Sequence, residues 1–168
     1  MLDIGMTLAT NLFGELDVVL KDGFSESFEL SFENRKMETF LFIHEQTLSG
    51  DNADAIIDFL NQIPMLYNKA KNAILARKDD SKLIRYFIDE EVENIDTLHE
   101  IFNVESNDDI TNEMFIKQPE LSGIGINRNQ DSELDWHIDL TIAPEYTDEL
   151  LVVYFDSELE VTSITHES

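Results

Sequence analysis

The chain has 168 residues, of which 42% are hydrophobic, and this is enough apolar material to build the core of one domain spanning residues 1–168. It carries 36 acidic and 11 basic residues, so its formal net charge is −25, and its field repels nucleic-acid phosphates and anionic membranes. Because cysteine is absent, disulfides and thiolate zinc sites are excluded, and the charge argues against a nucleic-acid partner.

No targeting or membrane segment is expected. Residues 1–14 contain neither a basic region nor a continuous apolar run, so they do not resemble a secretory signal. The sequence also has no apolar stretch of about 18 residues that could cross a membrane. We therefore expect a cytoplasmic protein.

Alternating apolar and polar residues predict three N-terminal strands, at 16–20, 28–32 and 39–43, which would form a meander. Residues 1–11 show no clear period, and we expect them to form either a loose arm or an edge element. The exposed edge of such a meander can pair with another chain, so a homodimer is left open.

The apolar period becomes helical after residue 52. It predicts a helix over 53–78, a second over 82–93 and a third over 95–102, followed by a helical turn at 113–117. Pro64 falls inside the first pattern, so we expect a kink there or two abutting helices.

Four further strands are predicted, at 121–126, 134–142, 150–155 and 159–164. The strand at 134–142 alternates strictly, which indicates one buried and one solvated face, whereas 150–155 is apolar throughout, as in a strand covered on both faces. The resulting fold class is α+β: two mostly antiparallel β-meanders form a sheet, and about three central helices pack on one face of it.

The sequence does not predict a metal site, although two groups of polar residues resemble one in part. Oxygen ligands alternate along the loop 127–133 as in a calcium loop, but Ser132 replaces the required glycine and Ile138 the required glutamate. His137 lies between Asp135 and Asp139 on the solvated face of its strand, where a cation could bind, although a solvated face is the simpler interpretation.

No catalytic motif is present. The sequence lacks a nucleophile elbow, a phosphate-binding loop and a dinucleotide-binding glycine motif. Pairs of adjacent carboxylates arise by chance among 36 acidic residues. We therefore expect no enzyme activity, no catalytic residue and no cofactor.

Carboxylates crowd the end of the predicted helix 82–93 and the segment after it. The helix macrodipole disfavours negative charge at the C-terminal end of a helix, at a small free-energy cost. Either this cost is simply tolerated, or the patch binds a basic protein, since complementary charge sets association rate and specificity. The predicted partner-binding residues are Asp89, Glu90, Glu91, Glu93, Asp96, Glu100, Asp108 and Asp109.

From Leu60 onward the chain resembles a bacterial family of uncharacterised proteins, the domain-of-unknown-function family numbered two thousand and four. The likeness is carried by the runs YNKAKNAIL (67–75), IRYFIDEEVE (84–93), GIGI (123–126), DWHID (135–139), LLVVYFD (150–156) and ITHES (164–168). The resemblance implies a small cytoplasmic α+β module and brings no established activity, substrate or catalytic residue.

Small size, strong acidity and the lack of catalytic motifs lead to one leading hypothesis. It is a non-catalytic acidic binding protein, most concretely an immunity-type inhibitor that neutralises a basic bacterial toxin, such as a nuclease, by covering its positive active site. One alternative is a soluble domain of unknown function whose acidity serves only solubility. A third alternative is a divalent-cation-binding module that uses the loop 127–133.

Overall fold

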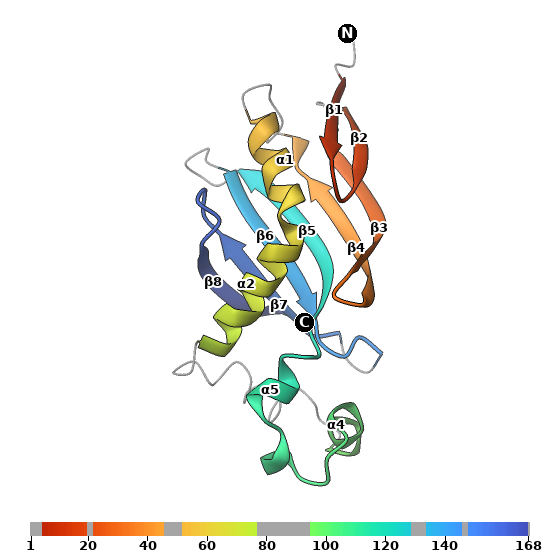
Figure 1. The fold of residues 1–168 in the computed structure, drawn as a ribbon, viewed down its shortest axis with the longest axis vertical. Coiled ribbons are helices and arrows are strands. Elements are labelled where there is room, and N and C mark those ends of the chain that lie inside the picture. Colours follow the sequence, from red (N-terminus) through yellow and green to blue (C-terminus); the bar gives the residue numbers. More distant parts are fainter. Residues whose placement is uncertain are drawn as a thin grey trace.

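The computed structural model describes residues 5–19, 22–45, 52–76, 95–128, 134–145 and 148–167. The strands in these ranges are β1 (Gly5–Thr10), β2 (Gly14–Val19), β3 (Phe24–Phe32), β4 (Arg35–Ile43), β5 (Glu120–Arg128), β6 (Leu134–Thr141), β7 (Leu150–Phe155) and β8 (Val161–Glu167). The helices are α1 (Ala53–Asn61), α2 (Ile63–Ala76), α4 (Ile95–Phe102), the 3-10 turn η4 (Asn107–Asp109) and α5 (Asn112–Phe115). The predicted α+β class is confirmed (Figure 1).

Six strands form one mixed sheet in the order β3-β4-β5-β6-β7-β8. It consists of two antiparallel parts, β3–β4 and β5–β8, which meet where β4 lies beside β5. β3 pairs antiparallel with β4, and β5 to β8 pair antiparallel in chain order, as the alternating sequence predicts. The joint is parallel, because residues 40–43 of β4 lie beside residues 123–126 of β5. A parallel pair needs a long crossover, and the helical region between β4 and β5 supplies it.

α1 and α2 lie across one face of this sheet (Figure 1). Phe59 of α1 is fully buried and stacks on Trp136 of β6, with 4.7 Å between the ring centroids. Ile138 and Leu140 alternate with polar residues along β6 and are also buried. The predicted break near Pro64 is confirmed as two abutting helices, because a proline has no N–H to continue the helical ladder.

The predicted three-stranded N-terminal meander is wrong in the pairing of its first strand. β2 pairs with β1, with Leu8 beside Leu16, and it meets the chain before β3 only through an isolated bridge between Val19 and Gly23. Gly23 has a φ of 72° and its amide donates to the Val19 carbonyl at 2.9 Å, so the chain turns sharply there. Both leucines are buried in the core. The N-terminal residues are therefore the edge element of a second, two-stranded sheet.

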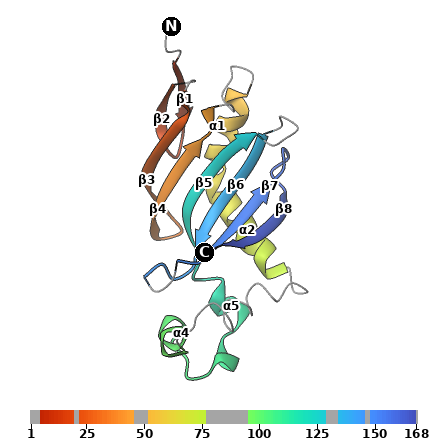
Figure 2. The same ribbon diagram turned by 180° about the vertical axis from the view of Figure 1, so that it is seen from behind.

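The predicted packing of about three central helices on one face of the sheet is not confirmed. The predicted helix 82–93 lies outside the described residues, whereas α4 has the predicted bounds but lies with α5 beyond the end of the sheet (Figures 1 and 2). Phe102 of α4 stacks on Phe115 of α5 at 6.3 Å, and Ile110 between them is buried. Phe102 therefore packs α4 on α5, and α4 does not lie over the face of the sheet (Figure 1).

The opposite face of the six-stranded sheet carries none of the described helices (Figure 2). Val152 of β7 points to this side and is nevertheless only 3% exposed. Its cross-strand neighbours are Asp139 of β6 and Thr165 of β8, and their side chains shield it. On this side the apolar run of β7 is therefore buried by neighbouring side chains and not by a second layer.

Candidate functional site

Four of the carboxylates predicted to bind a partner, Asp96, Glu100, Asp108 and Asp109, lie beyond the end of the sheet (Figure 1). We define the acidic lobe as residues 95–117, which comprise α4, η4, α5 and their connections. Lys117 is its single lysine or arginine, so the lobe is strongly negative. Its carboxylate residues are all exposed, and they are Asp96, Glu100, Glu105, Asp108, Asp109 and Glu113.

The structure brings only part of the predicted site together. Asp96 and Glu100 lie on α4, and Asp108 and Asp109 belong to η4. The remaining predicted residues, Asp89, Glu90, Glu91 and Glu93, lie outside the described residues. Glu105 and Glu113 add two exposed carboxylates that the sequence did not single out, although both belong to the same acidic run.

Arg35, Lys36, Lys69 and Lys71 each form an ion pair with a carboxylate outside the acidic lobe. Lys71 Nζ lies 3.1 Å from Glu33 Oε2, and Lys69 Nζ lies 2.8 Å from Glu160 Oε1. Within the described part of the chain, four lobe residues have no such partner: Glu105, Asp108, Asp109 and Glu113. The lobe therefore presents carboxylates whose charge no described cation neutralises.

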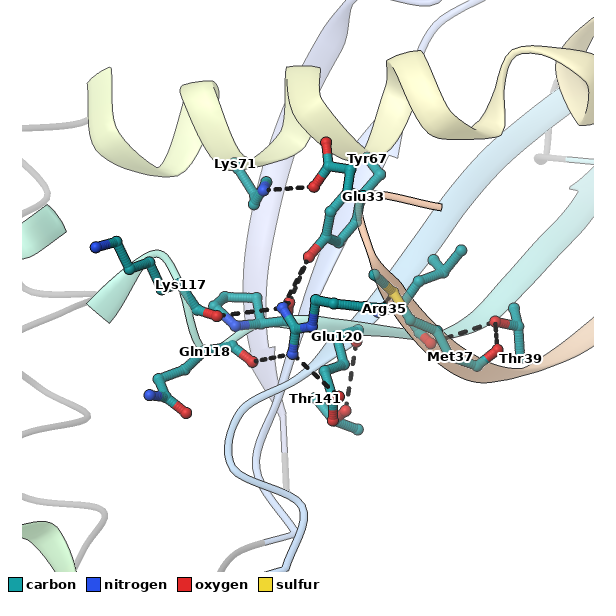
Figure 3. A network of polar contacts seen from close by, with 12 residues as sticks. Glu33, Arg35, Met37, Thr39, Tyr67, Lys71, Lys117, Gln118, Glu120 and Thr141 are labelled. Carbon is teal, nitrogen blue, oxygen red and sulfur yellow. Dashed lines mark hydrogen bonds and ion pairs between the residues drawn. The ribbon is translucent and has the colours of Figure 1, made fainter. Parts of the chain in front are cut away.

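A network centred on Arg35 ties the acidic lobe to the sheet (Figure 3). Arg35 Nη1 donates to the carbonyl oxygens of Lys117 at 3.1 Å and Pro119 at 3.2 Å, and Nη2 lies 3.0 Å from Glu120 Oε1. These acceptors lie where the chain leaves the lobe and enters β5. A guanidinium offers five N–H donors in a fixed plane, so it can hold several acceptors of one segment at once. Arg35 thereby fixes the lobe relative to β4.

Tyr67 of α2 completes this network from the helix side (Figure 3). Its hydroxyl donates to the Pro119 carbonyl at 2.6 Å, and Lys71 Nζ lies 4.5 Å from its ring centroid, in cation–π contact. Burial raises the pKa of the Tyr67 phenol, Arg35 lowers it, and two nearby carboxylates raise it again. The phenol therefore stays protonated and keeps donating to Pro119 at neutral pH.

A cleft of about 250 Å³ opens beside the network. Its lining residues are Arg35, Glu100, Ile101, Gln118, Glu120, Ala143, Pro144 and Glu145. The carboxylates come from three separate segments, whereas the guanidinium among them is already held by backbone carbonyls and by Glu120. Ala143 has a left-handed φ of 48°, a conformation that turns the chain and brings Glu145 to the cleft. The cleft therefore favours a cationic group.

Sequence reasoning does not identify Arg35, Tyr67 or Glu145. Arg35 belongs to a polar turn, and its carbonyl acceptors follow it by 82 to 84 residues. Tyr67 has the spacing of an ordinary core residue on a helix. Only the crossover from β4 to β5 brings these groups together, so no local pattern could have indicated them.

Two histidines pair with carboxylates away from the lobe. His137 Nε2 lies 3.8 Å from Asp139 Oδ1, and His166 Nε2 lies 3.0 Å from Glu149 Oε2. Across the described ranges, no three metal-ligating side chains converge, and residues 129–133 of the loop considered for calcium fall outside those ranges. Among the same residues, no helix has the length and apolar character needed to cross a membrane.

No family model, no curated protein and no solved structure matches this chain. The resemblance to the domain-of-unknown-function family numbered two thousand and four therefore stays a prediction. Function has to be inferred from the geometry and charge of the lobe, the cleft and the sheet.

Proposed function

We propose that the protein is a non-catalytic acidic binding protein whose partner is a basic protein, most concretely an immunity-type inhibitor that neutralises a basic bacterial toxin. The supporting observation is the acidic lobe, where exposed carboxylates outnumber a single lysine. Complementary charge steers two proteins together and suppresses wrong partners. A toxin that binds nucleic acid carries a positive active site, which such a lobe would cover.

The cleft beside the lobe supports the same partner chemistry. Glu100 and Glu145 face a space of about 250 Å³, which is of the size of one long side chain. A lysine or arginine of the partner that enters this space exchanges water for carboxylate oxygens, and such charge-assisted hydrogen bonds are stronger than neutral ones. The lobe would supply long-range attraction and the cleft one specific anchor.

The Arg35 network adds preorganisation. The segment that leaves the lobe is held by Arg35 and by Tyr67, through the carbonyls of Lys117 and Pro119. A surface that is already ordered loses less conformational entropy when a partner binds. The end of the lobe that leads into β5 is therefore held to the sheet before a partner binds.

Charge neutralisation tests this function with the purified product of a toxin-like gene adjacent to this gene in its host. The test variant carries Glu105→Gln, Asp108→Asn, Asp109→Asn and Glu113→Gln. The control variant carries Glu15→Gln, Glu26→Gln, Glu45→Gln and Glu158→Gln, which removes the same charge at exposed positions elsewhere. We expect association to slow by about tenfold at low salt for the lobe variant only.

Two results would contradict the proposal. If neither variant changes association, the lobe is not the contact surface. If both variants slow association equally, only the net charge matters, and the acidity then serves solubility and general attraction. Survival of toxin-expressing cells that carry each variant gives the matching readout for inhibition.

A further inference from the structure

The sheet face that points away from α1 and α2 is organised in two rows of cross-strand neighbours (Figure 2). One row contains Phe42, Gly125, His137 and Tyr154. The next row contains Phe40, Gly123, Asp139 and Val152. We call the surface formed by these two rows the open face. It is aromatic at β4 and polar at β6 and β7.

The aromatic end of the open face is exposed to an unusual degree. Phe40 is 45% exposed and Phe42 is 37% exposed, and they lie two positions apart on one strand. Among the described residues, the other large hydrophobic residue this exposed is Met65, on α2. Neighbouring exposed aromatic rings mark an interaction surface, since isolated apolar residues are common but contiguous ones are not.

Two glycines shape the middle of the open face. A Cβ on Gly125 would collide with the imidazole of His137, and a Cβ on Gly123 would collide with the carboxylate of Asp139. The side chains of His137 and Asp139 therefore lie flat over β5, where these glycines leave room. The polar end of the face thus reaches toward Phe42 and Phe40 and does not stand apart from them.

The polar end of the open face is negatively charged. Burial raises the pKa of the Tyr154 phenol, and Glu167, Asp135 and Asp139 each raise it further. Burial also raises the pKa of the Asp139 carboxyl, while His137 lowers it and Glu167 raises it. Burial is the largest cause of both pKa shifts, and Glu167 contributes to both as a nearby negative charge, which a cation placed beside Tyr154 would offset.

We propose that the open face is a docking surface for a basic protein segment that presents an apolar side chain at one end and a lysine or arginine at the other. The apolar group packs on Phe40 and Phe42, and the cation lies over Tyr154, close to Asp139 and Glu167. Phe42 and Tyr154 stand on strands three spacings apart, so the two partner groups are separated by about 14 Å.

Charge decides which occupant fits. A second copy of this chain would bring a net charge of −25 and the same carboxylates against the polar end of the open face, so the two copies would repel each other. A basic partner meets both ends with complementary groups. This docking surface rests on the proposed function only in the positive charge of the partner, because its residues are separate from the acidic lobe.

Two synthetic peptides of equal length and charge serve as probes: one presents phenylalanine and lysine about four positions apart, on the same side of an extended chain, and the other has serine in place of phenylalanine. Each is titrated into the full chain while backbone amide shifts are followed by NMR. We expect the lysine–phenylalanine peptide to bind about tenfold more tightly, with shifts in β4, β6 and β7. Phe40→Ser/Phe42→Ser should abolish that preference, whereas Met65→Ser, which removes an equally exposed apolar side chain from α2, should retain it.

A second variant tests the polar end without touching the aromatic rings. Asp139→Asn/Glu167→Gln should weaken binding of both peptides by a similar factor and leave the preference for phenylalanine unchanged. Equal affinity of the wild-type protein for the two peptides would overturn the proposal. So would an equal loss of preference in Met65→Ser, which would show that binding is not confined to the open face.

Light scattering tests whether a second copy of this chain occupies the open face instead. A dimer that Phe40→Ser/Phe42→Ser converts to a monomer would overturn the proposal, because a second copy would then cover the face; a monomer in both proteins supports it. The fourfold lobe variant separates the two surfaces. If neutralising the lobe does not change toxin association but the protein still prefers the phenylalanine peptide, the proposed inhibitor function is wrong. The proposal of a docking surface is then still supported.

Discussion

Arg35 and Tyr67 share one acceptor, because both donate to the carbonyl oxygen of Pro119, at 3.2 and 2.6 Å. Through this one atom β4 and α2 are both connected to the segment that enters β5. Pro119 is buried, and a buried acceptor left without a donor costs about 1–3 kcal/mol. The shared carbonyl is therefore a point where a small change should have a large effect on stability.

Arg35→Ala should lower the free energy of unfolding by about 2–3 kcal/mol, because it removes a hydrogen-bond donor from several carbonyls and the ion-pair partner of the Glu120 carboxylate. Urea denaturation measures this loss. The control is Lys36→Ala at the next position, where the side chain is 78% exposed and lies 3.9 Å from Glu29. Its effect should stay within about 0.5 kcal/mol. Similar losses in both variants would show that Arg35 is an ordinary surface residue.

Tyr67→Phe should change how stability depends on alkaline pH. The folded-state pKa of Tyr67 lies above its ordinary value of 10.0, so above that pH the unfolded chain loses a proton that the folded protein still holds. Stability is therefore fully present below pH 10.0 and is lost as pH rises through the folded-state pKa. The variant should be about 1 kcal/mol less stable at pH 8, and its stability should decline less as the pH rises above 10.0.

Urea titrations at a series of pH values test that expectation. Tyr154 also has a raised pKa and is present in both proteins, so part of the alkaline decline should remain in Tyr67→Phe. Parallel stability curves for the two proteins would mean that the Tyr67 phenol ionises alike in the folded and unfolded chains.

Gly125→Ala should destabilise the protein by about 1–3 kcal/mol, because the added methyl group collides with the His137 imidazole. In a His137→Ala background the same substitution should cost at least about 1 kcal/mol less, since the obstacle is gone. A double-mutant cycle by thermal or urea unfolding gives this coupling. The control is Gly5→Ala in β1, where the new Cβ would meet only the Val18 carbonyl oxygen, at 3.6 Å. Additive effects of Gly125→Ala and His137→Ala would refute the contact.

Asp139→Asn should stabilise the protein slightly at neutral pH, by less than about 1 kcal/mol. The folded-state pKa of Asp139 is raised, chiefly by burial, so its stabilising effect is full below the ordinary value of 3.8 and is lost as pH rises through the folded-state pKa. The gain from Asn should therefore shrink as pH falls toward 4. Glu158→Gln removes the same charge from an exposed position and controls for net-charge relief. A gain that is constant with pH would argue against the raised pKa.

The sequence predicts well those strands whose burial follows from an alternating pattern, as in β6, or from a continuous apolar run, as in β7. β6 and β7 match the predicted ranges within one residue, and α4 begins and ends where predicted. β1 gives no such signal, because its small and polar residues carry little apolar contrast. β2 pairs with β1 through the turn at residues 11–13, where Gly14 has a φ of 72°, and a strand pattern alone does not reveal which neighbour a strand takes.

The sites are less predictable than the strands, for a physical reason. The acidic run is visible in composition, so Asp96, Glu100, Asp108 and Asp109 could be named in advance. The open face could not, because Gly125 and Phe42 become neighbours only through the parallel pairing of β4 with β5. The glycines of β5 indicate a bulge or a close backbone approach; a register shift does occur at Leu121–Gly123, but the close contact is made by a side chain of β6.

The parallel seam between β4 and β5 also determines how the chain can fold. β3–β4 and β5–β8 close over short connections, whereas Thr39 donates to the Leu121 carbonyl across 82 residues. Closing a loop of that length costs about 4 kcal/mol of chain entropy, before the contacts it permits give anything back. We therefore expect the pairing of the β3–β4 hairpin with the β5–β8 strands to be the rate-limiting step of folding. Substitutions where residues 40–43 of β4 pair with residues 123–126 of β5 should slow folding, and substitutions in β8 should mainly accelerate unfolding.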